Sequence, residues 1–272
     1  MSEDPRAFVA GVFDRASATY DAVGVDFYGH IAEFLVNEVG LQPGERVLDV
    51  GCGRGAVLFR AAPIVGPTGR VTGIDLAPGM VAATAQEIAG RGLRNVDVHL
   101  DDAQEPDLAD ASYDVILASL SLFFLPRPPE ALARYHRALM PGGRFGCTTF
   151  AGDDARWAWF EEGRTTFMAG HDFRAPGADS FASDDSISTL LKTTGFSDVT
   201  HVKHQFDVRF ESREHWWRWT WSQSLRGTWE QLSEETMAQA RAFIDENLER
   251  IAEPDGSLIY RQPVRVTTAA SA

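Results

Sequence analysis

Three alternating glycines at the end of a short apolar run constrain the fold of this chain more than any other feature. The run Val47–Val50 includes one acidic residue, Asp49, and leads directly into Gly51, Gly53 and Gly55. Helix-like apolar sequence follows, so the stretch predicts a buried strand, a tight loop and a helix that starts at about Gly55. Because glycine has no Cβ, a ligand can lie against the loop, and free N–H groups at the helix start point toward it.

The glycines alone leave the identity of the ligand open. The spacing Gly51-x-Gly53-x-x-Ala56 also fits the dinucleotide fingerprint. Asp75 ends the next expected strand, about twenty residues further on, where a carboxylate can accept both hydroxyls of a ribose. Nicotinamide dinucleotides and adenosyl compounds share that ribose, so the pattern predicts a ligand that contains a nucleoside.

Acidic residues at two other positions discriminate between these ligands. Asp49, immediately before the glycines, would repel a pyrophosphate but suits a ligand that carries an ammonium group. Asp101 and Asp102 follow the third candidate strand, where a carboxylate can accept a hydrogen bond from an adenine amino group. Both features favour an adenosyl compound over a dinucleotide.

Four motifs occur in one order along the chain: Val47–Gly55, Gly73–Met80, Tyr113–Ser119 and Leu139–Phe145. Together they resemble the class I S-adenosylmethionine-dependent methyltransferases, above all those of quinone biosynthesis and related bacterial natural-product enzymes. The resemblance extends over residues 13–150 and is weak beyond them.

This resemblance implies that S-adenosylmethionine is the methyl donor and S-adenosylhomocysteine the product. It also implies that the segment around Asp14 and Tyr20 folds over the donor, with Tyr20 near the methyl group. The chain has Asp101 where the family has glycine, and we expect Asp102 to face the adenine. The residues expected to bind the donor are Tyr20, Asp49, Gly51, Cys52, Gly53, Asp75, Leu76, Met80, Asp102, Ala103 and Ser119.

The expected fold is α/β, a doubly wound, Rossmann-like sheet of seven mostly parallel strands with helices on both faces and a mostly helical lid. By resemblance, the last strand runs antiparallel. The expected segments are N-terminal helices that cover the cofactor (1–45), a donor-binding core (46–150), a lid insertion (151–182), a continuation of the core (183–206), an aromatic-rich helical lid insertion (207–254), and the last strand with a tail (255–272).

Apolar periodicity and turn residues place the individual elements. The expected helices are 8–20, 27–39, 56–62, 78–91, 130–140, 154–168, 184–195, 216–226 and 234–251. The expected strands are 47–50, 70–74, 96–100, 113–118, 144–150, 196–206 and 257–269.

One helix start lacks its usual cap. Pro78 suits the first turn of the helix, but Ala77 stands where relatives often place a serine N-cap. The missing cap is worth about 1 kcal/mol. We therefore expect a contact from elsewhere in the chain to hold this helix start.

Composition narrows the partners and the cellular compartment. The net charge of −14 disfavours nucleic acid and anionic membranes as partners, because both bind basic surfaces. Cys52 and Cys147 are the only cysteines, and they read as small buried residues in a reducing compartment. With neither a signal peptide nor a membrane-spanning run apparent, we expect a cytoplasmic enzyme that acts on a small molecule or a short peptide. The sequence shows no metal-binding cluster, and we expect none.

The acceptor site is expected to be aromatic. The loop after the fourth strand is unusually apolar, and at least one of Phe123 and Phe124 should line the pocket. If residues 216–226 form one helix, Trp217 and Trp221 share one stripe, whereas a second stripe contains the residues we expect to contact the acceptor. The predicted acceptor-binding residues are Phe123, Phe124, Trp217, Trp219, Ser222 and Arg226, which suit an aromatic or hydrophobic acceptor, with or without a carboxylate.

Four functions remain open on the sequence. The favoured one is metal-independent methyl transfer to oxygen, nitrogen or carbon of a natural-product-type acceptor, mainly by positioning. The second is methylation of a carboxylate on a peptide or acid substrate. The third is a relative that binds the donor without methylating, and the fourth is an NAD-dependent oxidoreductase. No catalytic base stands out, and the weak candidates are His171, His215, Tyr20 and Glu33.

Overall fold

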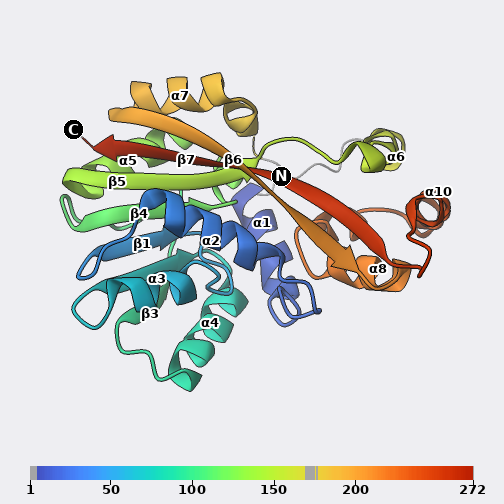
Figure 1. Ribbon diagram of the computed structural model, residues 1–272, viewed down its shortest axis with the longest axis horizontal. Helices are drawn as coiled ribbons and strands as arrows, with labels where there is room; N and C mark the ends of the chain where they lie inside the picture. The colour runs from blue at the N-terminus through green and yellow to red at the C-terminus, as the bar shows by residue number, and fades with distance from the viewer. Residues whose placement is uncertain (1–4, 169–174, 176, 272) are drawn as a thin grey trace.

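A single mixed sheet of seven strands forms the centre of the molecule (Figure 1). The structure is a computed structural model that describes residues 5–168, 175 and 177–271. The strand order is β3-β2-β1-β4-β5-β7-β6, and β7 pairs antiparallel with both β5 and β6. The predicted fold, including the reversed last strand, is therefore confirmed. The strands are β1 (Arg46–Val50), β2 (Arg70–Asp75), β3 (Val96–Leu100), β4 (Tyr113–Ser119), β5 (Leu139–Phe150), β6 (Phe196–Phe210) and β7 (Leu258–Ser271).

Helices pack on both faces of this sheet. Helices α2, α3 and α4 share one apolar core with the sheet, and α5 and α7 share the other (Figure 1). Parallel strands covered on both faces are expected to be apolar nearly throughout, and β1 is buried from Val47 to Val50. The helices are α1 (Pro5–Ala16), α2 (Phe27–Val39), α3 (Leu58–Val65), α4 (Pro78–Gly90), α5 (Pro128–Ala138), α6 (Trp159–Phe167), α7 (Asp184–Thr193), α8 (Arg213–Trp221), α9 (Arg226–Trp229) and α10 (Glu234–Ile251).

Several predicted boundaries need correction. Helix α1 ends at Ala16, because Thr19 and Tyr20 both turn back to hydrogen-bond the carbonyl of Ala16. Helix α3 begins only at Leu58, after a run of turns that starts at Gly53. Strand β5 begins at Leu139 and takes in the Pro-Gly-Gly segment predicted as a turn, opposite an irregular pairing with β4. The shifts move element ends without changing the order of the elements.

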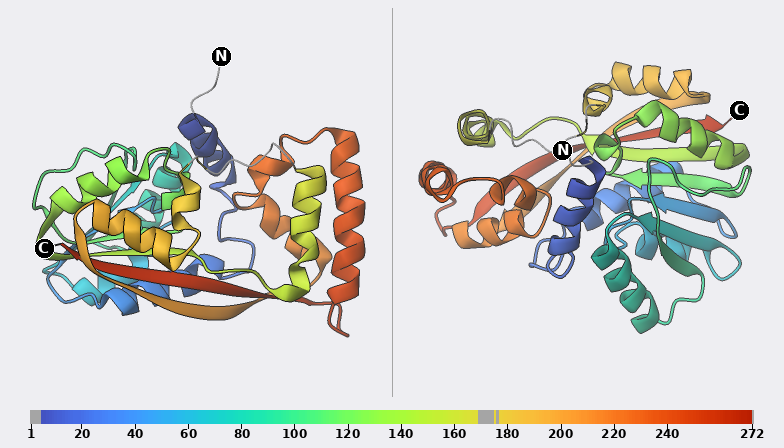
Figure 2. Two further views of the ribbon diagram at one scale, coloured as in Figure 1. Left: turned by 90° about the horizontal axis from the view of Figure 1, so that it is seen from above. Right: turned by 180° about the vertical axis from the view of Figure 1, so that it is seen from behind.

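Strands β6 and β7 continue beyond the sheet as a two-stranded ribbon. Their pairing runs without a break from Thr200, opposite Thr268, to Phe210, opposite Leu258, although residues 207–210 were predicted to begin a helical segment. The ribbon connects to α8 after β6 and to α10 before β7, and these two helices form, together with α6 and α9, what we call the helical cap (Figure 2). Because β6 runs parallel to β1–β5, the cap stands on the side of their carboxyl ends.

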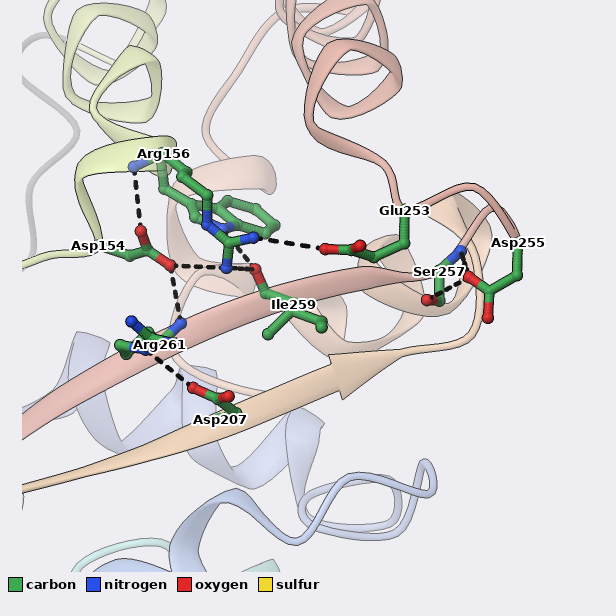
Figure 3. Close-up of polar contacts among 9 residues, drawn as sticks. Asp154, Arg156, Asp207, Glu253, Asp255, Ser257, Ile259 and Arg261 are labelled. Carbon is green, nitrogen blue, oxygen red and sulfur yellow. Dashed lines mark hydrogen bonds and ion pairs between the residues drawn. The ribbon is translucent and has the colours of Figure 1, made fainter.

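Polar contacts fasten the segment before α6 to this ribbon (Figure 3). The carboxylate of Asp154 accepts hydrogen bonds from the backbone N–H groups of Arg156 and Arg261, both at 3.0 Å. The carbonyl of Ile259 accepts from the Arg156 guanidinium at 2.8 Å and from the indole of Trp157 at 2.9 Å. These contacts fix how the cap insertion leaves the sheet.

Aromatic side chains fill the interior of the cap. Trp157, Trp216, Trp217 and Trp229 are all buried in one apolar cluster together with residues of the ribbon. The predicted single helix over 216–226 is wrong, because α8 ends at Trp221 and α9 begins at Arg226. Side chains between them bond to local backbone instead, which competes with helix continuation: the Ser222 hydroxyl donates to the Trp219 carbonyl, and the Gln223 side-chain oxygen accepts from the Leu225 N–H.

Candidate active site

A pocket lies at the carboxyl ends of β1, β2 and β4, beneath helix α1. In open α/β sheets, ligands bind at this edge, where the strand order reverses. All predicted donor-binding residues except Asp49 and Cys52 line the pocket: Tyr20, Gly51, Gly53, Asp75, Leu76, Met80, Asp102, Ala103 and Ser119.

The glycine loop forms the floor of this pocket. The N–H groups of Gly51 and Cys52 both donate to the carbonyl of Ile74, at 2.9 and 3.0 Å, which ties the loop to the end of β2. Gly51 has φ of 70°, and a Cβ there would lie 2.6 Å from the Cβ of Ser121. The backbone can therefore pass this close to the β4 loop only as glycine.

Asp49 lies beneath the loop with only 1% of its surface exposed. Neither carboxylate oxygen has a hydrogen-bond partner among the described residues. Burial, with a smaller contribution from the nearby charge of Asp75, raises the pKa of Asp49 to about 8. A buried carboxylate without a partner is costly, so the site fits a ligand that brings a cationic group, as the amino-acid part of S-adenosylmethionine does.

Asp75 is held rigidly at the end of β2. One carboxylate oxygen accepts from the Gly53 N–H at 2.8 Å and the other from the Ala77 N–H at 2.9 Å. Burial still raises the pKa of Asp75 above its usual value, against these bonds. Cys52 faces the other way, into the packing between the loop and Gly73, and supports the loop from behind.

Helix α1 covers the pocket with residues that the sequence reading did not single out. Arg6, Val9, Ala10 and Phe13 all line it. Their spacing of three and four residues places them on one helix face, and this spacing was the sequence signal that could have identified them. The guanidinium of Arg6 pairs with Asp102 at 2.7 Å, so this predicted adenine-binding carboxylate already faces the pocket and a cation.

The uncapped helix start receives its contact from the same segment. A carboxylate oxygen of Asp14 accepts from the Gly79 N–H, in the first turn of α4, at 2.6 Å. No capping side chain acts at Ala77 itself. The expectation that another part of the chain holds this helix start is confirmed.

Tyr20 closes the pocket beside Gly53. Its ring stacks on that of Tyr28 with centroids 4.5 Å apart. Burial raises the pKa of the Tyr20 hydroxyl well above its usual value, so this group keeps its proton at neutral pH. Tyr20 therefore acts as a wall and a hydrogen-bond donor far more readily than as a base.

The predicted acceptor residues separate into three places. Phe124 lines the donor pocket, whereas Phe123 packs between Phe124 and Phe150. Trp219 packs in the cluster between Phe27 and Phe210. The remaining three predicted acceptor-binding residues line a different hollow on the cap: Trp217, Ser222 and Arg226.

The candidate bases are likewise scattered. His215 donates from Nε2 to the Val23 carbonyl at 2.7 Å, and its Nδ1 accepts from the Glu211 N–H at 3.1 Å, which gives it a structural position away from the pocket. Glu33 is exposed on α2. His171 lies outside the described residues.

Two kinds of feature are absent from the described residues. No group of three or more His, Cys, Asp or Glu side chains in these parts of the chain is arranged to hold a metal ion. None of the described helices is long and apolar enough to cross a membrane.

Comparison with known proteins identifies the family. Residues 47–143 match the methyltransferase domain family. The chain is 38% identical to nocamycin O-methyltransferase of Saccharothrix syringae over 94% of this chain and 96% of that protein. It is 46% identical to the aklanonic acid methyltransferase DauC of Streptomyces sp. (strain C5), over 52% of this chain and 64% of that protein.

A solved structure gives the same fold at low sequence identity. A putative methyltransferase from Bacillus halodurans C-125 superposes with a TM-score of 0.61 and 19% identity, over 88% of this chain and 98% of that one. The pocket geometry, the unpartnered Asp49 and the nearly full-length relative agree, and the chain belongs to the class I S-adenosylmethionine-dependent methyltransferases.

Proposed function

We propose that this enzyme methylates an oxygen atom of a small, hydrophobic natural product. The observation that carries the proposal is the similarity to nocamycin O-methyltransferase, which runs through the cap as well as the donor-binding core. The pocket supports it, because the aromatic and apolar side chains of Phe13, Leu120 and Phe124 lie on its wall. An apolar wall of this kind suits a flat or greasy acceptor.

Residues at the edge of the sheet bind and orient the donor. Asp49 takes the ammonium group, Asp75 the ribose hydroxyls and Asp102 the adenine amino group. S-adenosylmethionine supplies, when bound, a methyl group on a sulfonium that needs no further activation. Because α1 covers the pocket, water is excluded from the place where the methyl is transferred.

The chain contributes mainly by positioning the acceptor. Among the described pocket residues, Tyr20 keeps its proton, and the acidic groups are assigned to the donor. Holding two reactants in line accounts for a large share of a bimolecular rate enhancement. We include in this proposal Phe123 and Phe124 as acceptor neighbours, the segments 151–182 and 207–254 as a lid, and turnover without a metal.

Calorimetry with S-adenosylhomocysteine tests the donor site. Asp75→Ala and Asp49→Asn should each weaken binding at least tenfold, since each removes charge-assisted contacts worth about 1.5–3 kcal/mol. Asp110→Asn, at an exposed surface carboxylate, should bind like the parent. Equal affinity in all four proteins contradicts the assignment.

The dependence on pH gives a second measurement on the same site. Without ligand, Asp49 is mostly protonated below its pKa of about 8, and an ammonium ligand favours the carboxylate. Binding should therefore release a proton, and affinity should fall as pH drops from 8 to 6, by up to about tenfold per unit. Asp49→Asn should flatten this slope.

Transfer of labelled methyl from the donor to a panel of hydrophobic phenols and acids then tests the acceptor class, and label only on nitrogen or carbon contradicts it.

A further inference from the structure

A second hollow lies outside the donor pocket, between the loop at residues 19–23 and helices α8, α9 and α10. Its volume is about 470 Å³, within the range of small-molecule sites. Val23, Trp217 and Trp221 give it an apolar interior. Thr19 faces this hollow whereas its neighbour Tyr20 faces the donor pocket, so the loop separates the two.

Three arginines surround the tryptophans. The guanidinium carbon of Arg241 lies 5.0 Å from the ring centre of Trp217, and that of Arg226 lies 5.7 Å from the ring centre of Trp221. Arg218, one helical turn after Glu214, completes the group. A guanidinium beside an indole is arranged to accept a planar ligand, because both groups stack and the guanidinium adds donors for an oxyanion.

Two of the three arginines already have acidic partners beside the hollow. Glu230 is shared between Arg226 and Arg15 of α1. Asp245 accepts from the Trp217 indole at 2.8 Å and lies 3.6 Å from Arg241.

Glu214 is committed as well, and its position leaves Arg218 available. The carboxylate of Glu214 takes its own backbone N–H and the hydroxyl of Ser212 at the start of α8, which lowers its pKa. Arg218 is exposed and makes no ion pair with any residue in the described part of the chain. One guanidinium of the hollow is therefore free to take an anion.

We propose that this hollow is a second binding site and that it takes a planar aromatic carboxylate. The chain carries a net charge of −14, but the exposed guanidinium of Arg218 has no ion-pair partner among the described residues and can attract an anion locally. Trp221, which is partly exposed, stacks on the ring system, and Arg218 binds the carboxylate through two parallel N–H donors. The inference concerns residues outside the donor pocket and does not depend on which atom the enzyme methylates.

Two probes with the same ring system, one anionic and one a neutral methyl ester, test the proposal. The full chain is titrated with 2-naphthoate and with methyl 2-naphthoate, followed by tryptophan fluorescence and calorimetry at low salt. We expect the anion to bind at least tenfold more tightly than the ester. Arg218→Gln should weaken the anion at least fivefold and leave the ester unchanged, whereas Trp221→Ala should weaken both.

The controls separate the hollow from the donor pocket and from general surface charge. Arg209→Gln, at an exposed arginine paired with Asp255 on the ribbon, should bind both probes like the parent. Saturating S-adenosylhomocysteine should leave naphthoate binding within about twofold. Competition between the two ligands, equal binding of the anion and the ester, or an Arg218→Gln variant with parental affinity would each overturn the proposal.

Discussion

The donor pocket and the helical cap hold their shapes in different ways. In the pocket, backbone groups at strand ends do most of the positioning, as where Gly53 and Ala77 donate to Asp75. In the cap, side chains do so, through packed indoles and through contacts such as Asp154 with the ribbon. The pocket also keeps Asp49 buried without a partner among the described residues, a cost that protonation or a cationic ligand relieves.

The donor pocket, shaped by backbone, suits a ligand that does not vary, whereas the cap, shaped by side chains, suits a ligand that does. A site made by backbone tolerates many side-chain changes but no added Cβ where the chain turns closest. A surface made by side chains changes its fit with each substitution, while the ribbon that supports it stays the same. Donor binding and cap stability should therefore respond to different mutations.

The largest effect is expected at Gly51, in the donor pocket. Gly51→Ala adds a Cβ at a φ of 70° and 2.6 Å from the Cβ of Ser121, so the loop must shift. We expect affinity for S-adenosylhomocysteine to fall at least a hundredfold, measured by calorimetry.

Gly66→Ala separates the clash from the backbone strain. Gly66 has a nearly equal φ of 67° but open space around its Cβ position. With ψ of −171°, Gly66 lies in a region almost confined to glycine, so its substitution should cost about 1–3 kcal/mol of stability from backbone strain alone and leave donor affinity within about twofold. If the two variants bind the donor equally well, close approach of the loop is not what shapes the site.

Much of the donor half could be predicted because its signals are local. A strand that ends in glycines or in an aspartate places those residues at one sheet edge whatever the rest of the chain does. The bounds of α2 and β3 follow from the same short patterns, and so does the missing N-cap at the start of α4. Arg6 and Phe13 were missed because the sequence does not show which face of α1 lies over the donor, although their helical spacing places them on one face.

The cap was predicted less well because its structure depends on contacts distant in sequence. The alternation of Asp207, Val208, Arg209 and Phe210 is a strand signal, but it was outweighed by the helix-like aromatic sequence that follows. The break between Trp221 and Arg226 depends on the small polar side chains between them, which bond to nearby backbone. Helical spacing alone therefore placed Trp219 beside the acceptor, whereas the structure packs it against the ribbon.

A smaller effect, confined to the cap, is expected at Asp154. Asp154→Ala leaves the N–H groups of Arg156 and Arg261 without their acceptor and should lower the free energy of unfolding by about 1–3 kcal/mol. Donor affinity should stay at the parental value. Asp207→Ala, which removes only a half-exposed pair with Arg261, should cost less than about 1 kcal/mol.

The pH dependence of the Asp154 effect has a definite sign. Burial acts to raise the pKa of Asp154, but hydrogen bonds from Arg156 and Arg261 outweigh it and leave the pKa below its usual value. Its stabilisation is therefore present above pH ~4 and is lost as pH falls through the folded pKa. Denaturant melts should show the difference between parent and Asp154→Ala shrinking in that acidic range. A constant difference down to pH 2 contradicts the ionic part of the account.

The smallest effect is expected where α1 meets the donor half. Asp14→Ala removes the acceptor of the Gly79 N–H and should cost about 1 kcal/mol, the worth of a helix cap. Asp14→Asn keeps an acceptor oxygen and should cost less. Ala77 has the extended backbone of an N-cap, with φ of −91° and ψ of 113°, so Ala77→Ser can cap the helix locally. In the parent, where Asp14 already serves this start, Ala77→Ser should add little; in the Asp14→Ala background it should recover most of the loss. Additive effects in the double mutant, read from chemical denaturation, would show that Asp14 and the N-cap position act independently and that α1 is held over the pocket by other contacts.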